Sequence, residues 1–238
     1  MKACNVVFDL DGTLIDSAPS ILVSLQAAFD AAGLRPVRPL AQDLIGPPLH
    51  ETLAALLPEG RTDQAAHLAG LFKQHYDETG YRDTRAYGGV ADMLKELRHH
   101  AYRLLIATNK RILPTRRIIS HLGWNGIFDE IHALDAFTPP LRSKAEMLAA
   151  LRSRLHAPTV YVGDRPEDAA AAQQAGFPFL LAAWGYTPTD YLEVQRYKAQ
   201  NPQVLAHLIQ AISPSNNRNN SITQRSIGTT PSSHCPDF

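Results

Sequence analysis

The sequence predicts an α/β fold, a doubly wound parallel sheet with a helical segment inserted after the first strand. Five short apolar runs recur along the chain, and each is followed by a turn and a helical pattern. Val, Ile, Leu and Phe fill these runs with little polar alternation, which is typical of strands buried on both faces. Strands that alternate with helices favour a parallel sheet covered by helices on both sides. The predicted strands are Ala3–Phe8, Arg103–Thr108, Glu130–Ala133, Val160–Gly163 and Phe179–Ala182.

Several helices of this predicted core have a recognisable face or end. One helix has an apolar face at i, i+3, i+4 and i+7 spacing, formed by Val90, Met93, Leu94 and Leu97. Ser143 and Glu146 have the spacing of a capping box that opens a helix running toward Leu155. Pro166 suits the first position of the following helix, and Gly176 is a typical residue to end it.

The first crossover, residues 16–87, is too long for one helix, and it shows several helical patterns but no convincing strand. Its first helix has an amphipathic face made of Ile21, Leu22, Leu25, Ala28, Phe29 and Ala32. Two further helical patterns, His50–Leu57 and Asp63–Asp77, follow after proline-containing breaks. We interpret residues 16–87 as a helical cap over the sheet, hinged near Asp16 and near residues 87–89. Asp16 is interpreted as the N-cap of the first cap helix.

The predicted core therefore comprises residues 1–15 and 88–212, and its last helix runs from Asn201 to Ile212. Residues 213–238 differ in composition, because Ser, Asn, Thr, Pro and Gly dominate them and few apolar side chains remain. Such a segment buries too little surface to offset the entropy that it would lose on ordering. We therefore predict a disordered tail over residues 213–238.

Charge and cysteine content narrow the class of protein. Lys plus Arg and Asp plus Glu are equal at 23 each, so no global field would attract nucleic acid or an anionic membrane. Only Cys4 and Cys235 are present, which is typical of a reduced cytosolic chain rather than a disulfide framework. The first apolar stretch is too short for a signal peptide, and no apolar run has membrane-spanning length. We expect a cytoplasmic protein that binds neither nucleic acid nor membrane.

An acidic pair follows the first predicted strand. Asp9 and Asp11 come directly at its end, and Gly12 lets the chain turn sharply after them. Two carboxylates at the ligand-binding edge of a parallel sheet repel each other unless a cation lies between them. Hard carboxylate oxygens suit Mg²⁺, which bridges protein and phosphate. The alternative is an Asx-type turn, in which Asp and Gly are common, but the position after an apolar strand favours a metal site.

Other candidate groups follow later strands or open helices. Thr108 and Asn109 end the second strand, where a hydroxyl and backbone N–H groups bind phosphate oxygens; a helix N-cap is the alternative. Lys144 falls at the first position of a helix, where its ammonium and the helix dipole both present positive charge; an ordinary surface lysine is the alternative. Asp164 follows a strand beside that of Asp9. Asp168 lies in the first turn of the next helix, where it either orients Lys144 or only stabilises the helix N-terminus by its negative charge.

The order of these motifs resembles that of the haloacid dehalogenase superfamily. Residues 8–14 are similar to its first motif, Thr108 and Asn109 to the second, Lys144 to the third, and Asp164 with Asp168 to the fourth. The resemblance covers residues 1 to about 212 and implies a Rossmann-like core, with residues 16–87 as the helical cap. Softer similarities point to the phosphoglycolate phosphatases: Thr108–Lys110, Tyr87–Val90 and Trp184–Tyr186. Two positions depart from the family pattern, since Ala145 stands where proline is usual and Arg165 where a small residue is usual.

The resemblance implies a covalent mechanism and a metal site. Asp9 would be the nucleophile that forms an aspartyl-phosphate, and Asp11 would be the acid and base. Mg²⁺ would be held by Asp9, by Asp11 through its main-chain carbonyl, and by Asp164. Asp168 would not bind Mg²⁺ itself but would orient water molecules or Lys144. The phosphoryl oxygens would be bound by Thr108, Asn109 and Lys144.

These expectations point to a phosphatase that acts on a small phosphorylated metabolite, most similar to phosphoglycolate phosphatase, as a monomer or homodimer. A sugar phosphomutase of the same fold is the nearest alternative, because it would use the same motifs. A haloacid dehalogenase is disfavoured, since Asp11 and Asp164 serve phosphate and metal rather than halide. A phosphate-binding regulatory protein without catalysis is a further alternative, which the complete set of acidic and lysine residues disfavours.

Overall fold

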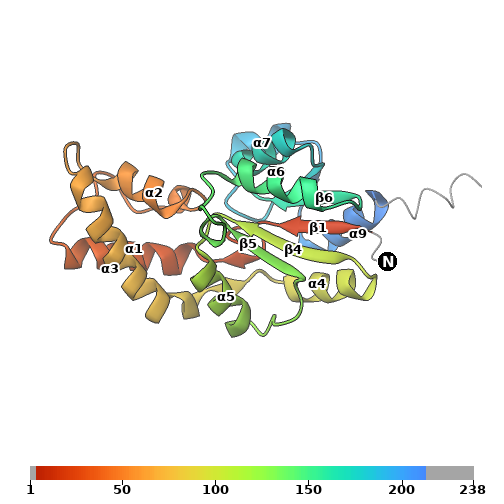
Figure 1. Ribbon diagram of the computed structural model, residues 1–238, viewed down its shortest axis with the longest axis horizontal. Coiled ribbons are helices and arrows are strands. Elements are labelled where there is room, and N and C mark those ends of the chain that lie inside the picture. The colour runs from red at the N-terminus through yellow and green to blue at the C-terminus, as the bar shows by residue number, and fades with distance from the viewer. Residues whose placement is uncertain (1–3, 213–238) are drawn as a thin grey trace, which may run out of the picture.

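Six parallel strands form the central sheet of the structure, a computed structural model that describes residues 4–212 (Figure 1). Their order across the sheet is β5-β4-β1-β6-β7-β8, and every pairing between neighbours is parallel. This confirms the predicted fold class. The strands are β1 (Asn5–Phe8), β4 (Arg103–Thr108), β5 (Glu130–Ala133), β6 (Thr159–Gly163), β7 (Phe179–Ala182) and β8 (Lys198–Ala199).

The two faces of the sheet bury separate hydrophobic clusters. Val6 and Phe8 of β1 pack with α4 (Val90–His99), α5 (Ile112–His121) and α9 (Pro202–Ile212) on one face. Val7 points to the other face and packs with α6 (Lys144–Arg154) and α7 (Pro166–Ala175). Figure 1 shows these two layers above and below the sheet. Side chains of successive strand residues point to opposite faces, so a strand covered on both sides has to be apolar throughout.

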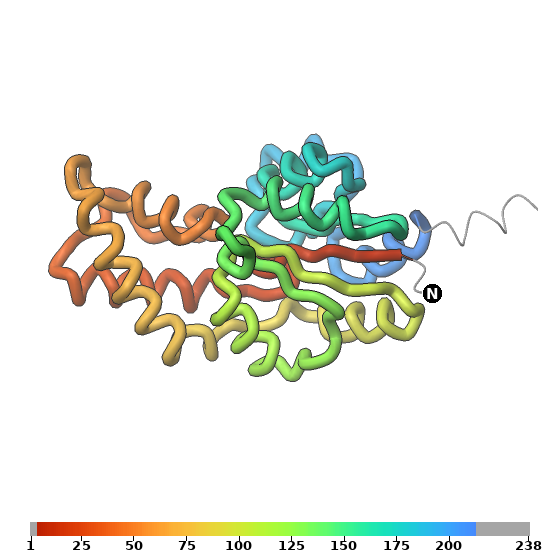
Figure 2. Tube along the Cα trace, viewed as in Figure 1, coloured from red at the N-terminus to blue at the C-terminus, as the bar shows by residue number. Residues whose placement is uncertain are grey.

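The helical segment between residues 16 and 87 lies beyond one end of the sheet (Figure 2). It contains α1 (Ala18–Ala31), α2 (Leu49–Leu56) and α3 (Ala65–Glu78), which pack around a hydrophobic cluster of their own. Two very short strands, β2 (Ile15–Asp16) and β3 (Arg85–Ala86), pair antiparallel where the segment leaves and rejoins the core. The division into core and cap stays a prediction, and we propose the β2–β3 pair as its hinge.

The remaining helices are short: α8 (Thr189–Val194) and the 3₁₀ turns η1 (Gln42–Leu44), η2 (Thr62–Gln64), η3 (Gly80–Asp83) and η4 (Leu134–Ala136). None of these, and none of the strands β2, β3 and β8, was predicted from the sequence. Each is too short for its apolar residues to show a period.

The predicted ends are confirmed for α7, half of the predicted capping box is formed at α6, and the predicted N-cap of α1 is wrong. α7 begins at Pro166 and ends before Gly176, as predicted. The Ser143 hydroxyl accepts the Glu146 N–H at 3.2 Å, but the Glu146 carboxylate accepts the N–H of Arg142 instead of completing the capping box. The interpretation of Asp16 as an N-cap is wrong. α1 starts at Ala18 after Ser17, and the Asp16 carboxylate instead accepts a hydrogen bond from the Tyr186 hydroxyl at 3.0 Å.

Within residues 4–212 no helix is both long and apolar enough to cross a membrane. The predicted disordered tail, residues 213–238, lies outside the described residues.

Candidate active site

The candidate residues meet at the carboxyl ends of three neighbouring strands. β1 lies between β4 and β6, so the residues that follow them, Asp9, Asn109 and Asp164, share one edge of the sheet. Lys144, the first residue of α6, reaches the same place, with its Nζ 3.0 Å from an oxygen of Asp9. This edge faces the cap, as expected for a ligand site in a sheet of this kind.

Three buried carboxylates gather there. Oxygens of Asp9, Asp164 and Asp168 lie within 4.8 Å of one another, and all three residues are almost fully buried. Burial raises the pKa of Asp9 to about 7; Lys144 opposes this shift, while Asp168 and Asp11 add to it. Burial, with the charges of Asp168 and Asp9, also raises the pKa of Asp164 well above its ordinary value. Ionisation of all three carboxylates would therefore place more negative charge in the cluster than its one neighbouring ammonium compensates.

The donor set fits a hard divalent cation. Asp168 uses both oxygens within the protein: one accepts from Lys144 at 2.5 Å, and the other from the N–H groups of Asp164 and Arg165 at 3.2 Å each. It thus anchors the loop after β6, and its predicted supporting role in the reaction stays a prediction. Asp9 and Asp164 are then the carboxylates placed to hold Mg²⁺, whose preferred ligands are such oxygens.

Lys144 is held between two carboxylates. Burial lowers the pKa of its ammonium, but the charges of Asp168 and Asp9 raise it more, so the net pKa lies above its ordinary value. Lys144 therefore carries a fixed positive charge beside Asp9, the nucleophile candidate.

The Asp11 carboxylate points away from this cluster. Its Oδ1 lies 3.1 Å from Nζ of Lys110 and accepts a hydrogen bond from the Ser17 hydroxyl. Gly12 adopts a φ of +82° directly after it, and a Cβ at Gly12 would collide with Asp164. The turn thus separates the two carboxylates, leaving Asp9 beside Asp164 and Asp11 on the cap side. The predicted metal contact of Asp11 through its main-chain carbonyl stays a prediction.

Thr108 and Asn109 differ in their surroundings. The Thr108 hydroxyl accepts the N–H of Lys110 at 3.1 Å, which stabilises the turn after β4. The Asn109 side-chain N–H donates to the carbonyl of Gly46 in the cap at 2.9 Å, while its buried Oδ1 has no hydrogen-bond partner among the described residues. Their predicted contacts to phosphate stay predictions.

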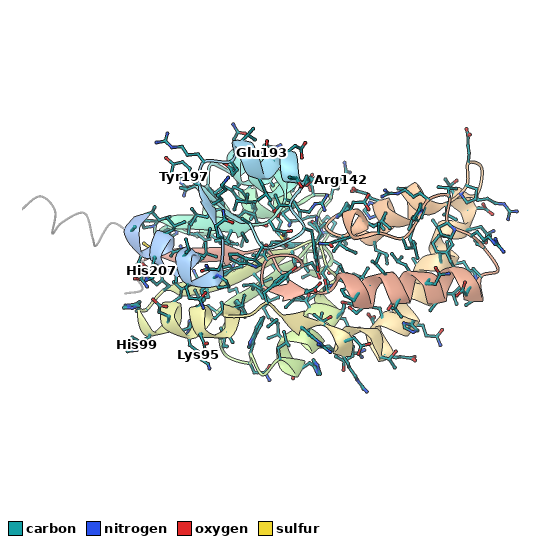
Figure 3. All side chains as sticks on the ribbon, turned by 180° about the vertical axis from the view of Figure 1, so that it is seen from behind. Lys95, His99, Arg142, Glu193, Tyr197 and His207 are labelled. Carbon is teal, nitrogen blue, oxygen red and sulfur yellow. The ribbon has the colours of Figure 1, made fainter. Side chains whose placement is uncertain are left out.

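Two cavities meet at the boundary between cap and core. The larger, of about 280 Å³, is lined by Asp9, Lys144, Asn109 and the exposed Arg142, which lies on the cap side of the core (Figure 3). The smaller, of about 80 Å³, contains Asp11 and Lys110 and is otherwise lined mainly by apolar cap side chains. Asp9, the nucleophile candidate, thus lines the larger chamber together with several charged side chains, and Asp11, the acid candidate, lines the smaller one.

Sequence reasoning assigned no role to several residues that connect the cap to this site. The Arg165 guanidinium donates to the carbonyl of Ile45 at 2.8 Å, so the residue that departs from the family pattern contacts the cap. Tyr186 donates its N–H to Asp164 at 2.8 Å, and its hydroxyl accepts the N–H of Ser17 at 2.8 Å. Arg165 and Tyr186 both lie within motifs noted in the sequence. Their place in these motifs was the only feature of the sequence that pointed to them.

The raised pKa of Asp9 predicts a pH-dependent stability. Because its pKa rises from 3.8 to about 7 on folding, the stability that it contributes is present below the lower value and lost as pH rises through the higher one. In EDTA, Asp9→Asn should therefore melt above the parent at pH ~8, and by less at pH ~5. Mg²⁺ should raise the melting temperature of the parent more than that of the variant. A melting-temperature difference that does not change with pH would contradict this electrostatic account.

Comparisons with known proteins agree with this geometry. The model of the haloacid dehalogenase-like hydrolase family matches residues 6–182. Phosphoglycolate phosphatase of Cereibacter sphaeroides is 30% identical over 218 residues, which are 86% of this chain and 99% of that protein. The solved structure of a haloacid dehalogenase-like hydrolase from Streptococcus pneumoniae superposes with a TM-score of 0.73 at 27% identity, covering 87% of this chain and all of that one.

A relative with a different name is also similar. Tyrosine-protein kinase PtkA of Mycobacterium tuberculosis is 34% identical over 193 residues, which are 79% of this chain. The chain spans 65% of the length of that relative.

Proposed function

The chain belongs to the haloacid dehalogenase-like hydrolases, and from this membership and the site geometry we propose a phosphatase that cleaves a small phosphomonoester through a phosphoryl intermediate on Asp9. One observation carries the proposal. A buried carboxylate at a strand end lies 3.0 Å from a buried ammonium and lines a cavity of about 280 Å³. This arrangement supplies a nucleophile together with the positive charge needed to receive a phosphate ester.

The residues divide the reaction into two steps. In the first, Asp9 attacks phosphorus while the ester P–O bond breaks, and Asp11 gives its proton to the departing oxygen. In the second, Asp11 takes a proton from water, the water oxygen bonds to phosphorus, and the bond to Asp9 breaks to release inorganic phosphate. Lys144 and Asn109 hold the phosphoryl oxygens. Mg²⁺ held by Asp9 and Asp164 would offset the repulsion between the carboxylate and the anionic phosphate.

The two cavities indicate a small substrate. The departing oxygen has to reach Asp11, so the organic part of the ester extends toward the chamber of about 80 Å³. This chamber suits a leaving group of a few atoms better than a hexose, which disfavours the phosphomutase alternative. The relatives named phosphoglycolate phosphatase support a two-carbon leaving group for this chain. We propose phosphoglycolate as its substrate and the cytoplasm as its location.

Similarity to the mycobacterial tyrosine-protein kinase supports a second candidate, phosphoryl transfer to a tyrosine side chain. The mouth of the larger cavity at the exposed Arg142 is the side from which a larger acceptor would approach. In such a transfer a tyrosine hydroxyl, rather than water, would take the phosphoryl group.

A substrate panel distinguishes these functions. We expect phosphoglycolate to give the highest kcat/KM, with one phosphate released per ester consumed. The panel also contains a hexose phosphate and ATP with a tyrosine peptide. Isomerisation of the hexose phosphate without phosphate release would support a mutase, and phosphotyrosine formation a kinase. Binding of phosphoglycolate without any turnover would instead indicate a regulatory protein.

A further inference from the structure

A chain of polar contacts connects the cap to Asp11. Tyr76 lies on the cap helix α3, and its hydroxyl is 3.0 Å from Nζ of Lys110, which follows β4 in the core. The same Nζ is 3.1 Å from Oδ1 of Asp11. Lys110 thus bridges one cap residue and one residue of the proposed mechanism, across the boundary at which the cap would move.

The Lys110 side chain is buried at the boundary between the cap and the core. Its side chain is 7% exposed, and its ammonium lies 4.7 Å from the centre of the Tyr76 ring. A buried ammonium needs hydrogen-bond acceptors, and the Oδ1 atom of Asp11 and the Tyr76 hydroxyl supply them. Since Ser17 donates to the same Asp11 oxygen, the second oxygen of Asp11 remains to face a departing group.

The contact with Tyr76 makes this arrangement depend on the cap. The Tyr76 hydroxyl can contact Lys110 only while α3 lies against the core, as it does in the structure. Separate contacts hold the two parts together nearby, since Arg111 pairs with Asp77 through two hydrogen bonds of 2.9 and 2.6 Å. Cap closure and cap-dependent orientation of Lys110 therefore rest on different neighbouring residues, which allows them to be tested separately.

We propose that Lys110 and Tyr76 are positioning residues that orient Asp11 toward the leaving group, and that Tyr76 exerts this effect only when the cap is closed. The inference rests on the proposed phosphatase function. Neither residue touches the phosphoryl group; both act through Asp11. Proton delivery needs close alignment of donor and acceptor, so loss of either contact should slow phosphoryl transfer to Asp9 only from substrates whose leaving oxygen must be protonated. The later attack of water also uses Asp11, but that step is the same for every substrate.

Two small substrates separate this effect from binding. Phosphoglycolate releases an alkoxide, which needs a proton from Asp11 as the P–O bond breaks. Acetyl phosphate is similar in size but releases acetate, which leaves without a proton. The ratio kcat/KM reports the reaction up to departure of the leaving group and not the later hydrolysis that both substrates share. Because general acid catalysis contributes about 10²–10⁴-fold, we expect Lys110→Met to lower kcat/KM for phosphoglycolate by at least ~30-fold and for acetyl phosphate by less than ~3-fold. Tyr76→Phe should show the same selectivity with a smaller loss.

Asp77→Asn is the matched control. It removes the neighbouring contact to Arg111 and keeps both Tyr76 and Lys110, so it should change the ratio of kcat/KM for the two substrates less than Tyr76→Phe does. Tyr76→Phe keeps the ring that stacks on Phe72 at 5.3 Å, and unchanged melting temperatures would show that the variants are folded.

Equal losses for both substrates in Tyr76→Phe and Lys110→Met would overturn the inference and leave only a role in closing the cap. A parent enzyme that releases phosphate from neither ester would contradict the proposed function itself, and the inference with it.

Discussion

Asp9→Asn is expected to lower kcat for phosphoglycolate by at least ~10³-fold, as the loss of other catalytic nucleophiles does. The amide is a far poorer nucleophile than the carboxylate, and no other described carboxylate lies as close to Lys144 except Asp168, whose oxygens are already bonded. The variant should remain folded, because asparagine matches aspartate in shape and removes a charge whose burial is unfavourable. Steady-state phosphate release measures the effect.

The matched control for this variant is Asp92→Asn. Asp92 lies exposed on α4, where it pairs only loosely with Lys95 at 3.7 Å, so this change should leave kcat within twofold, a small effect typical of surface substitutions. Residual activity of Asp9→Asn within tenfold of the parent would exclude a covalent mechanism at Asp9.

Removal of divalent metal is the second large effect that we expect. Asp9 and Asp164 are buried together, and both have raised pKa values, so without a cation their charges oppose both each other and an incoming phosphate ester. EDTA should therefore lower phosphate release to background, and Mg²⁺ should restore it. Ca²⁺ should inhibit, because its larger and more flexible coordination shell suits the site less well.

EDTA already saturated with Mg²⁺ serves as the control for direct effects of the chelator. Asp164→Asn should need more Mg²⁺ for half-maximal activity than the parent does. Full activity in a metal-stripped sample would contradict the assignment of this cluster as a metal site.

The core strands could be predicted from the sequence because burial on both faces forces them to be apolar throughout. β4, β5 and β7 have the predicted bounds, and β6 begins one residue earlier, at Thr159. β8 was missed, since a strand of two residues carries no pattern. Asp16 was misassigned for a different reason. Its partner, Tyr186, is 170 residues away in the chain, and local capping rules cannot show such a contact.

The candidate site likewise contains residues that could be predicted from the sequence and contacts that could not. Asp9, Lys144 and Asp164 were predictable because each follows a strand or begins a helix, and strand ends in a parallel sheet converge. Contacts across the cap boundary were not, because they depend on how α3 and the loop at Ile45 lie against the core. Lys110 shows the difference: it was noted only as part of a motif, whereas the structure places it beside Asp11.

The central claim is that a phosphoryl group is bonded to Asp9 during turnover. Acid quenching of the parent enzyme during hydrolysis of phosphoglycolate, followed by mass spectrometry of its peptides, tests this claim most directly. We expect the peptide containing Asp9 to gain the mass of one phosphoryl group, and the gain to disappear once the substrate is exhausted. Phosphate release with the phosphoryl group on another residue, or on none at any quench time, would contradict the claim.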